Sequence, residues 1–291
     1  MDEGTWLAQQ FEKNRGHLRG VAYRMLGSLS EADDAVQETW LRLSCCDAGD
    51  IQNLSGWLTT VVARVCLDML HSRTADREES LAAQLESITN KPGISDPEQE
   101  TLLADSVGVA LLVVLDRLKP AERLAFVLHD VFAVPFEEIA TIIDRTPEAA
   151  RQLASRARRR VQAKESDSST NLSEQRKVID AFLTALQSGD FEGLVAVLDP
   201  DVRVHIDAEA GRPGASREIR GARNWAQGPV AFSRAARFAQ PALVDGSVGI
   251  VIAQHGKLSR VLRFTIANGK IVQAEIIAEP TRLRKLDLAV L

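Results

Sequence analysis

A short basic segment of the chain, residues 147–164, carries the residue types that bind DNA. It contains one acid, Glu148, and six bases: Arg151, Arg156, Arg158, Arg159, Arg160 and Lys164. An Arg side chain can bond guanine through two N–H groups, and the amide of Gln152 can bond adenine in the same way. The whole chain has a formal charge of −5, but a phosphate backbone responds to the local field. The net charge therefore excludes no class of partner.

Helical spacing places these side chains on the outer face of a helix. The sequence predicts a short helix over Pro135–Asp144, a tight turn, and a second helix over Pro147–Ala163. Thr146 is a good N-cap and Pro147 a good first helical residue. Asp144 suits the turn, because Asp tolerates left-handed backbone. Two helices joined in this way form a helix-turn-helix motif, which favours DNA binding over the alternative, a solvated basic face.

The first 73 residues also keep helical spacing. We predict that one helix ends at Gly27, that a second opens at Ser30 with Asp33 as its capping partner, and that a third follows a loop over Asp47–Gly56. Pro120, Pro135 and Pro147 are each expected in a first helical turn. Residues 74–98 lack periodicity and are predicted to be a linker.

This linker lies in an acidic stretch. Residues 74–106 contain eight acids and two bases. Like charge would keep such a segment solvated and extended.

The last third of the chain has a different pattern. Residues 165–173 are small and polar at their start, which predicts a flexible junction. Two amphipathic helices follow, over Glu174–Ser188 and Phe191–Leu198. Strand-like runs then dominate: Val202–Asp207, Pro241–Val244, Ser247–Gln254, Leu258–Ala267 and Lys270–Ala278. Asn268-Gly269 predicts a hairpin between the last two. The pattern indicates an α+β domain with a curved antiparallel sheet.

Three stretches, in order, resemble the RNA polymerase sigma factors of the extracytoplasmic-function group: SEADDAVQETWLRL, WLTTVVARVCLDMLHSR and RLKPAERLAFVLHDVFAVPFEEIATIIDRTPEAARQLASRARR. The likeness covers residues 10–73 and 108–163. Residues from 174 onward resemble a SnoaL-like cone-shaped domain, which one subgroup of these sigma factors carries. The resemblance implies a multidomain chain: sigma domain 2 (1–73), an acidic linker (74–98), sigma domain 4 (99–164), a flexible linker (165–173) and an α+β SnoaL-like barrel domain (174–291).

The resemblance also implies partners, namely core RNA polymerase and promoter DNA. The acidic helix near residues 30–43 would dock on the polymerase through Asp33, Asp34, Gln37 and Glu38. Acids at a helix N-terminus also complement the helix dipole. For Asp33 and Asp34, this structural role is the alternative to polymerase binding.

The loop ahead of the third helix would read the −10 element, a step that flips a base out of its stack. Its candidate residues are Asn53, Ser55, Trp57 and Arg64. Trp57 could instead be a packing anchor. The second helix of the helix-turn-helix would read the −35 element through Thr146, Arg151, Gln152, Ser155 and Arg156, with Arg158 and Arg159 on phosphates.

A SnoaL-like domain implies a pocket in which a small molecule could bind. His205 and Asp207 alternate on a predicted strand and so face one side, where they could form an acid–base pair. Trp225, His255 and Arg263 are further pocket candidates. The alternative is a His and an Asp on a solvent-facing edge. Residues 207–212 depart from the glycine-rich segment of the fused subgroup, and the linker lacks that subgroup's Trp-Leu-Pro-Glu-Pro signature.

Composition limits the remaining possibilities. Three cysteines, Cys45, Cys46 and Cys66, cannot form a disulfide framework and lack zinc-site spacing. No apolar run approaches the ~20 residues of a membrane span. The polar N-terminal stretch is unlike a secretory signal. We therefore expect a cytoplasmic protein with no metal, no other cofactor and no membrane contact.

Three functions fit these features. The first is a non-enzymatic transcription initiation factor whose C-terminal domain packs against the sigma domains and modulates activity. A fused domain makes a separate anti-sigma factor less necessary. The second is a SnoaL-like cyclase or hydrolase joined to a DNA-binding module. The third is a helix-turn-helix regulator whose C-terminal domain senses a ligand, for which a dimer on a palindrome would be evidence.

Overall fold

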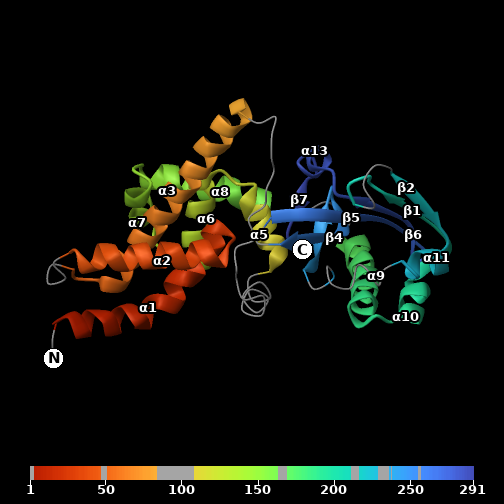
Figure 1. Ribbon diagram of the computed structural model, residues 1–291, viewed down its shortest axis with the longest axis horizontal. Helices are drawn as coiled ribbons and strands as arrows, with labels where there is room; N and C mark the ends of the chain where they lie inside the picture. The colour runs from red at the N-terminus through yellow and green to blue at the C-terminus, as the bar shows by residue number, and fades with distance from the viewer. Residues whose placement is uncertain are drawn as a thin grey trace. The chain divides into compact units, whose positions relative to one another are not determined.

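The computed structural model describes residues 3–46, 51–83, 108–162, 169–210, 216–228, 236, 238–254 and 257–291 (Figure 1). The chain divides into two compact units. The first unit comprises Met1–Leu102 and Leu115–Arg158, and the second comprises Leu103–Val114 and Arg159–Leu291.

Helices build the first unit in two groups. The first group comprises α1 (Glu3–Leu26), α2 (Leu29–Ser44) and α3 (Leu54–Ala83), which pack against one another. The second group comprises α6 (Pro120–Phe126), a π-helical turn (Val127–Val131), α7 (Phe136–Ile142) and α8 (Pro147–Val161). Most of α5 (Val109–Asp116) belongs to the second unit. The fully buried side chains of the first group include Leu18, Tyr23, Met25, Leu43 and Leu58. These positions match the apolar face that helical spacing predicts.

The ends of the first helices correct two predictions. α1 ends as predicted at Gly27, whose φ of +74° is left-handed. α2 begins at Leu29 rather than Ser30, because Ser28 is extended and its Oγ accepts the Glu31 N–H at 3.5 Å. α3 continues to Ala83, ten residues into the predicted linker. That stretch contains no Gly or Pro and has three Ala, two Glu, one Arg and one Leu, residues that favour a helix even without an amphipathic pattern.

The helix-turn-helix forms over α7 and α8. Pro147 is the first residue of α8, and Pro120 is the first residue of α6. Pro135 is the extended N-cap of α7 and not a helical residue, so that prediction is wrong by one position. Asp144 has a φ of +53°, as the turn prediction requires. The left-handed residue redirects the chain so that α8 can pack on the other helices of the group.

The second unit is built on a seven-stranded sheet with the strand order β2-β1-β6-β5-β4-β3-β7. Its strands are β1 (Leu198–Ile206), β2 (Arg217–Arg220), β3 (Ala239–Val244), β4 (Ser247–Gln254), β5 (Lys257–Ala267), β6 (Lys270–Ile277) and β7 (Leu288–Ala289). The pairing is antiparallel except between β1 and β6, so the prediction of a purely antiparallel sheet is wrong. Most of the domain separates these two strands in sequence, and no hairpin fixes their relative direction.

Helices cover one face of this sheet. They are α9 (Ser169–Ser188), α10 (Phe191–Val197) and α11 (Ala222–Ala226), and a short α13 (Pro280–Leu283) precedes β7. α9 packs on β3 and β4, while α10 and α11 pack on β1 (Figure 1). α9 begins at Ser169, within the predicted flexible linker. Asn268 and Gly269 both have positive φ, as expected for a tight hairpin turn. The result is the α+β arrangement predicted for this part of the chain.

Candidate nucleic-acid interface

The exposed face of α8 carries most of the predicted −35 residues. Ala150, Ala154, Ala157 and Val161 are buried, which fixes the orientation of the helix. Arg151, Gln152, Arg156 and Arg159 are exposed on the remainder, while Ser155 and Arg158 are half-buried. Thr146 caps the helix, because its Oγ1 accepts the Ala149 N–H at 3.3 Å. The backbone N–H groups at the start of α8 could therefore bind a phosphate.

Two of the arginines on α8 are held by carboxylates of the same unit. Arg151 pairs with Glu137 at 3.0 Å and with Glu148 at 3.4 Å. Arg158 pairs with Asp130. Exposed ion pairs of this kind contribute at most about 1 kcal/mol, so a phosphate or a base edge can compete for either guanidinium. Arg156 makes no ion pair with any residue in the described part of the chain.

The predicted −10 residues lie at the start of α3. Asn53 is the N-cap, since its Oδ1 accepts the Gly56 N–H at 3.1 Å. This bond uses the amide oxygen of Asn53 and leaves its NH₂ group as a donor. Ser55 is exposed in the first turn, and Trp57, two positions further along, is half-buried. Residues 47–50 of the preceding loop lie outside the described residues.

Arg64 connects the two candidate surfaces. It is exposed on α3, and its Nη2 donates to the backbone carbonyl of Thr141 on α7 at 3.0 Å. The predicted −10 phosphate contact is thus bonded to the first helix of the helix-turn-helix.

A further set of polar contacts, here called the junction, joins the two groups of helices. Arg123 on α6 has a side chain only 3% exposed, and its Nε donates to the Arg24 carbonyl at 3.0 Å. Burial lowers the pKa of Arg123 to about 10, partly offset by Asp116, whose carboxylate lies 3.7 Å from Nη1. The Arg24 guanidinium lies 5.2 Å from the Phe132 ring centre. The two groups of helices therefore meet through cations, carbonyls and an aromatic ring.

His17 lies at the edge of the same junction. Its ring meets the Phe132 ring edge-on at 5.0 Å, and its Nε2 lies 3.2 Å from Thr59 Oγ1. Partial burial lowers the pKa of His17 below 6.5.

The predicted polymerase-docking residues line one face of α2. Asp33 pairs with Arg19 at 2.7 Å, and Glu38 pairs with Arg42 at 2.9 Å. Asp34 and Gln37 are exposed. A groove between α2 and α3 includes Asp34 and Glu38.

From α3 this groove also takes side chains that the sequence analysis missed: Val65, Asp68, Met69, Ser72 and Arg73. Their three- and four-residue spacing is the signal that could have found them, because it places them on one helix face.

Comparison with known proteins identifies the chain. Residues 10–76 match the family model for Sigma-70 region 2, and residues 108–161 match that for Sigma-70, region 4. The chain is 35% identical to the probable ECF RNA polymerase sigma factor SigI of Mycobacterium tuberculosis, over 98% of both chains. It is an extracytoplasmic-function RNA polymerase sigma factor. The ECF sigma factor SigJ of the same species is 36% identical over 94% of this chain and 92% of that one. The SigJ crystal structure covers 95% of this chain and 98% of its own, with 32% identity and a TM-score of 0.46.

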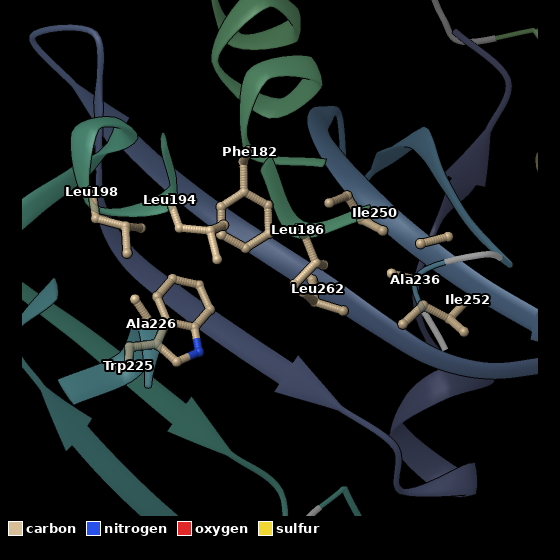
Figure 2. Close-up of a pocket in the computed structure, with 11 residues that line it drawn as sticks. Phe182, Leu186, Leu194, Leu198, Trp225, Ala226, Ala236, Ile250, Ile252 and Leu262 are labelled. Carbon is tan, nitrogen blue, oxygen red and sulfur yellow. The ribbon is translucent and has the colours of Figure 1, made fainter. Parts of the chain in front are cut away.

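The C-terminal domain of this sigma factor contains an apolar hollow between its helices and the inner face of its sheet (Figure 2). The lining comprises Phe182, Leu186, Leu194, Leu198, Trp225, Ala226, Ala236, Ala239, Ile250, Ile252 and Leu262. Trp225 was predicted for such a pocket and lies in it. Phe182 stacks on Trp225 with ring centres 5.4 Å apart.

His205 and Asp207 do not reach this hollow, which corrects the sequence prediction for them. His205 is exposed on the outward face of β1. Asp207 follows the end of β1, where the alternation of side chains stops. Its Oδ2 accepts the backbone N–H groups of Ala278 and Glu279, each at 3.1 Å, and its Oδ1 lies 3.5 Å from Arg282. Asp207 thus anchors the segment that follows β6.

The other pocket candidates also lie elsewhere. Arg263 bonds Glu275 at 3.1 Å and Asp245 at 3.2 Å, on the opposite side of the sheet from the hollow-lining Leu262. His255 lies outside the described residues. Within the part of the chain described, no group of three His, Cys, Asp or Glu side chains could hold a metal ion. No described helix is long and apolar enough to cross a membrane.

Proposed function

We propose that this sigma factor binds core RNA polymerase and directs it to promoters, with α8 reading the −35 element and the start of α3 reading the −10 element. The observation that carries the proposal is the presence, in family order, of Sigma-70 regions 2 and 4, each with its candidate surface at an exposed helix face. Identity to SigI across the whole chain supports the same function.

Within α8, exposure and spacing divide the roles. Gln152 and Arg156 are exposed and four positions apart, so they project from neighbouring turns of one face toward successive base edges. Arg151 and Ser155 lie on the same side. Arg158 is held by Asp130 at the flank of the helix, which suits a phosphate contact.

The groove between α2 and α3 suits a basic helix of the polymerase. Asp34, Glu38 and Asp68 contribute carboxylates from two helices, and Val65 and Met69 contribute apolar surface between them. A docked helix carrying Arg or Lys would bury the apolar part and pair with the acidic rim. We assign Asp34 and Glu38 to pairing with the basic residues of the docked helix, and we place Asp33 and Gln37 at the edge of the groove.

The described conformation of the first unit is a closed one. At 3.4 Å per base pair, elements named for positions ten and thirty-five lie on the order of 80 Å apart. Arg64 of the −10 module is bonded directly to Thr141 of the −35 module. The two groups of helices cannot keep the Arg64–Thr141 bond and contact the −10 and −35 elements at the same time. We infer that the two groups of helices separate before promoter binding, and that the C-terminal domain modulates this step.

Run-off transcription with core RNA polymerase tests the proposal. We expect promoter-dependent transcripts from the full chain and a changed output from a chain ending at Asn171. Arg156→Ala should lower transcription at least tenfold at a cognate promoter. Arg176→Ala, at an exposed arginine of α9 outside both DNA-binding modules, is the matched control and should not. Failure of both chain lengths to bind core polymerase would overturn the proposed function.

A further inference from the structure

The guanidinium of Arg151, on the exposed face of α8, is held at three points. Its Nη2 donates to Glu137 Oε1 at 3.0 Å, and its Nη1 donates to Glu148 Oε1 at 3.4 Å. Its Cζ lies over the Phe136 ring, 5.6 Å from the ring centre. Phe136 and Glu137 belong to the first turn of α7, and Glu148 belongs to the first turn of α8. Both helices of the helix-turn-helix therefore fix this one side chain.

The Phe136 ring is itself held in place. The imidazole of His129 stacks on it with ring centres 3.8 Å apart and an interplanar angle of 27°. His129 Nδ1 lies 3.1 Å from the carbonyl oxygen of Val134, which fixes the imidazole in turn. The Arg151 side chain is 50% exposed, and an exposed arginine loses rotamer entropy when a partner immobilises it. Because these contacts already restrict Arg151, a partner that binds it in this orientation meets a smaller entropic cost.

The charge around Arg151 distinguishes between two kinds of DNA contact. Glu137 and Glu148 place two carboxylates beside one guanidinium, so the net charge of this group is negative and repels a phosphate. The edge of a base carries no net charge and is not repelled in this way. A guanidinium also has more N–H groups than the two carboxylates use, so donors remain for a base edge. Arg151 is therefore better suited to a base than to the DNA backbone.

We propose that Phe136 and Glu137 are positioning residues, which orient Arg151 to read one base pair of the −35 element and disfavour its use as a phosphate contact. This inference rests on the proposed function and deepens it. Base edges in the major groove present their acceptors in a fixed pattern, and a planar guanidinium bonds two of them only when it lies in the right plane. The Phe136 ring and the Glu137 carboxylate set that plane from α7, while Glu148 assists from α8.

Selection of DNA by the holoenzyme tests the role of Arg151. The full chain bound to core RNA polymerase is given a library of promoter-length duplexes of random sequence, and sequencing of the retained duplexes gives the base preference at each position. We expect Arg151→Ala to lower the preference at one −35 position by roughly 5- to 150-fold. Arg151→Lys keeps the charge and loses the planar fork, so it should lose the same preference. A lysine would preserve a phosphate contact.

Variants of α7 test the two positioning residues. Glu137→Gln removes the charge from the bond to Nη2 and should lower the preference at the same position by roughly 2- to 10-fold. Phe136→Leu removes the aromatic face and should lower it by roughly 2- to 5-fold, whereas Phe136→Tyr keeps the ring and should not. Glu138→Gln, at an exposed glutamate in the same turn, is the matched control and should change no position.

The outcomes separate a positioning role from a structural one. Circular dichroism shows that each variant is folded, and a merely structural role would weaken binding equally at every position. That equal loss, or an unchanged preference in folded Glu137→Gln and Phe136→Leu, overturns the proposal. A stronger preference in Glu137→Gln also overturns it, because Glu137 would then hold Arg151 away from DNA.

The same library distinguishes this proposal from the function on which it rests. If the wild-type holoenzyme selects no sequence, the proposed function fails and the positioning role fails with it. If the wild-type holoenzyme selects a sequence and the α7 variants select it equally well, only the positioning role fails.

Discussion

Two contacts in this protein differ in character: the one between the two groups of helices in the first unit, and the one between the helices and the sheet in the second unit. Where the two groups of helices meet in the first unit, a buried arginine, backbone carbonyls and an aromatic ring form the contact. In the second unit the inner face of the sheet is apolar throughout its described core. When two surfaces separate, their polar groups can form hydrogen bonds to water instead, whereas their apolar groups become exposed to water at a cost in free energy. The difference suggests that the first contact is built to open and the second to stay closed around its hollow.

The largest expected effect of a substitution is in the apolar interior. Leu198→Ala removes a side chain that is 1% exposed, and we expect it to lower the free energy of unfolding of the second unit by about 2–5 kcal/mol. Segment-resolved hydrogen exchange on the full chain measures this for each unit separately. Leu41→Ala, at a leucine 50% exposed on α2, is the control and should change little. An equal loss of protection in both units would contradict the assignment of Leu198 to the core of the second unit alone.

Removing the buried cation of the junction should have a smaller effect. Arg123→Ala leaves the Arg24 carbonyl without its donor, and we expect a loss of about 1–3 kcal/mol, confined to the first unit. The same hydrogen-exchange measurement gives the value, with Arg176→Ala as the control. If protection falls in α9 and the sheet instead of in α1 and α6, the assignment of Arg123 to the junction is wrong.

Acid should affect the two units in different pH ranges. His17 has a pKa lowered below 6.5 by partial burial, so its unfolded form binds protons more readily and stability falls as the pH drops below 6.5. At Glu275, burial tends to raise the pKa, but hydrogen bonds from Arg282 and Arg263 lower it below 4.5 overall. Its contribution is present above pH 4.5 and is lost below it.

We therefore expect the first unit to lose protection at a higher pH than the second in an acid titration followed by hydrogen exchange. His17→Gln should remove the step that lies below pH 6.5 and leave the step at lower pH unchanged. Loss of both units at one pH would contradict this order.

The smallest expected change in stability comes from the exposed link between the two groups of helices. Arg64→Ala removes one hydrogen bond to Thr141, which contributes under about 1 kcal/mol. We expect slightly faster hydrogen exchange in α7 and no change in the second unit. Arg42→Ala removes an exposed ion pair on α2 and should leave α7 unaffected. Unchanged exchange in α7 of the Arg64 variant would mean that this bond does not hold the closed form.

Local patterns in the sequence predicted most elements of both units. The helical spacing of the apolar residues, the turn at Asp144 and the hairpin at Asn268-Gly269 depend on neighbours in sequence, and the structure confirms them. β2 was missed because its four residues include only one apolar side chain, Ile219, and therefore show no alternation. β7 has two residues, too few for any period to be visible.

Local sequence patterns could not predict contacts between residues that are far apart in the chain. Arg64 and Thr141 are 77 positions apart, and Arg24 and Arg123 are 99 apart. Nothing in the local sequence marks Arg123 as buried, because burial depends on how α6 packs. Asp207 was assigned to a pocket from strand alternation alone, whereas its role depends on backbone N–H groups 71 and 72 positions away. Trp225 does line a hollow of the domain, whose pocket the resemblance to SnoaL-like domains implied.

The length of α3 fixes a distance in this sigma factor. Its 30 residues, at 1.5 Å each, form a rod of about 45 Å between the N-terminal turn beside Asn53 and its last residue, Ala83. The distance of the end of α3 from Asn53 is therefore set by helix geometry. Under the proposed function, we expect that shortening or breaking this rod would change the spacing between promoter elements that the protein tolerates.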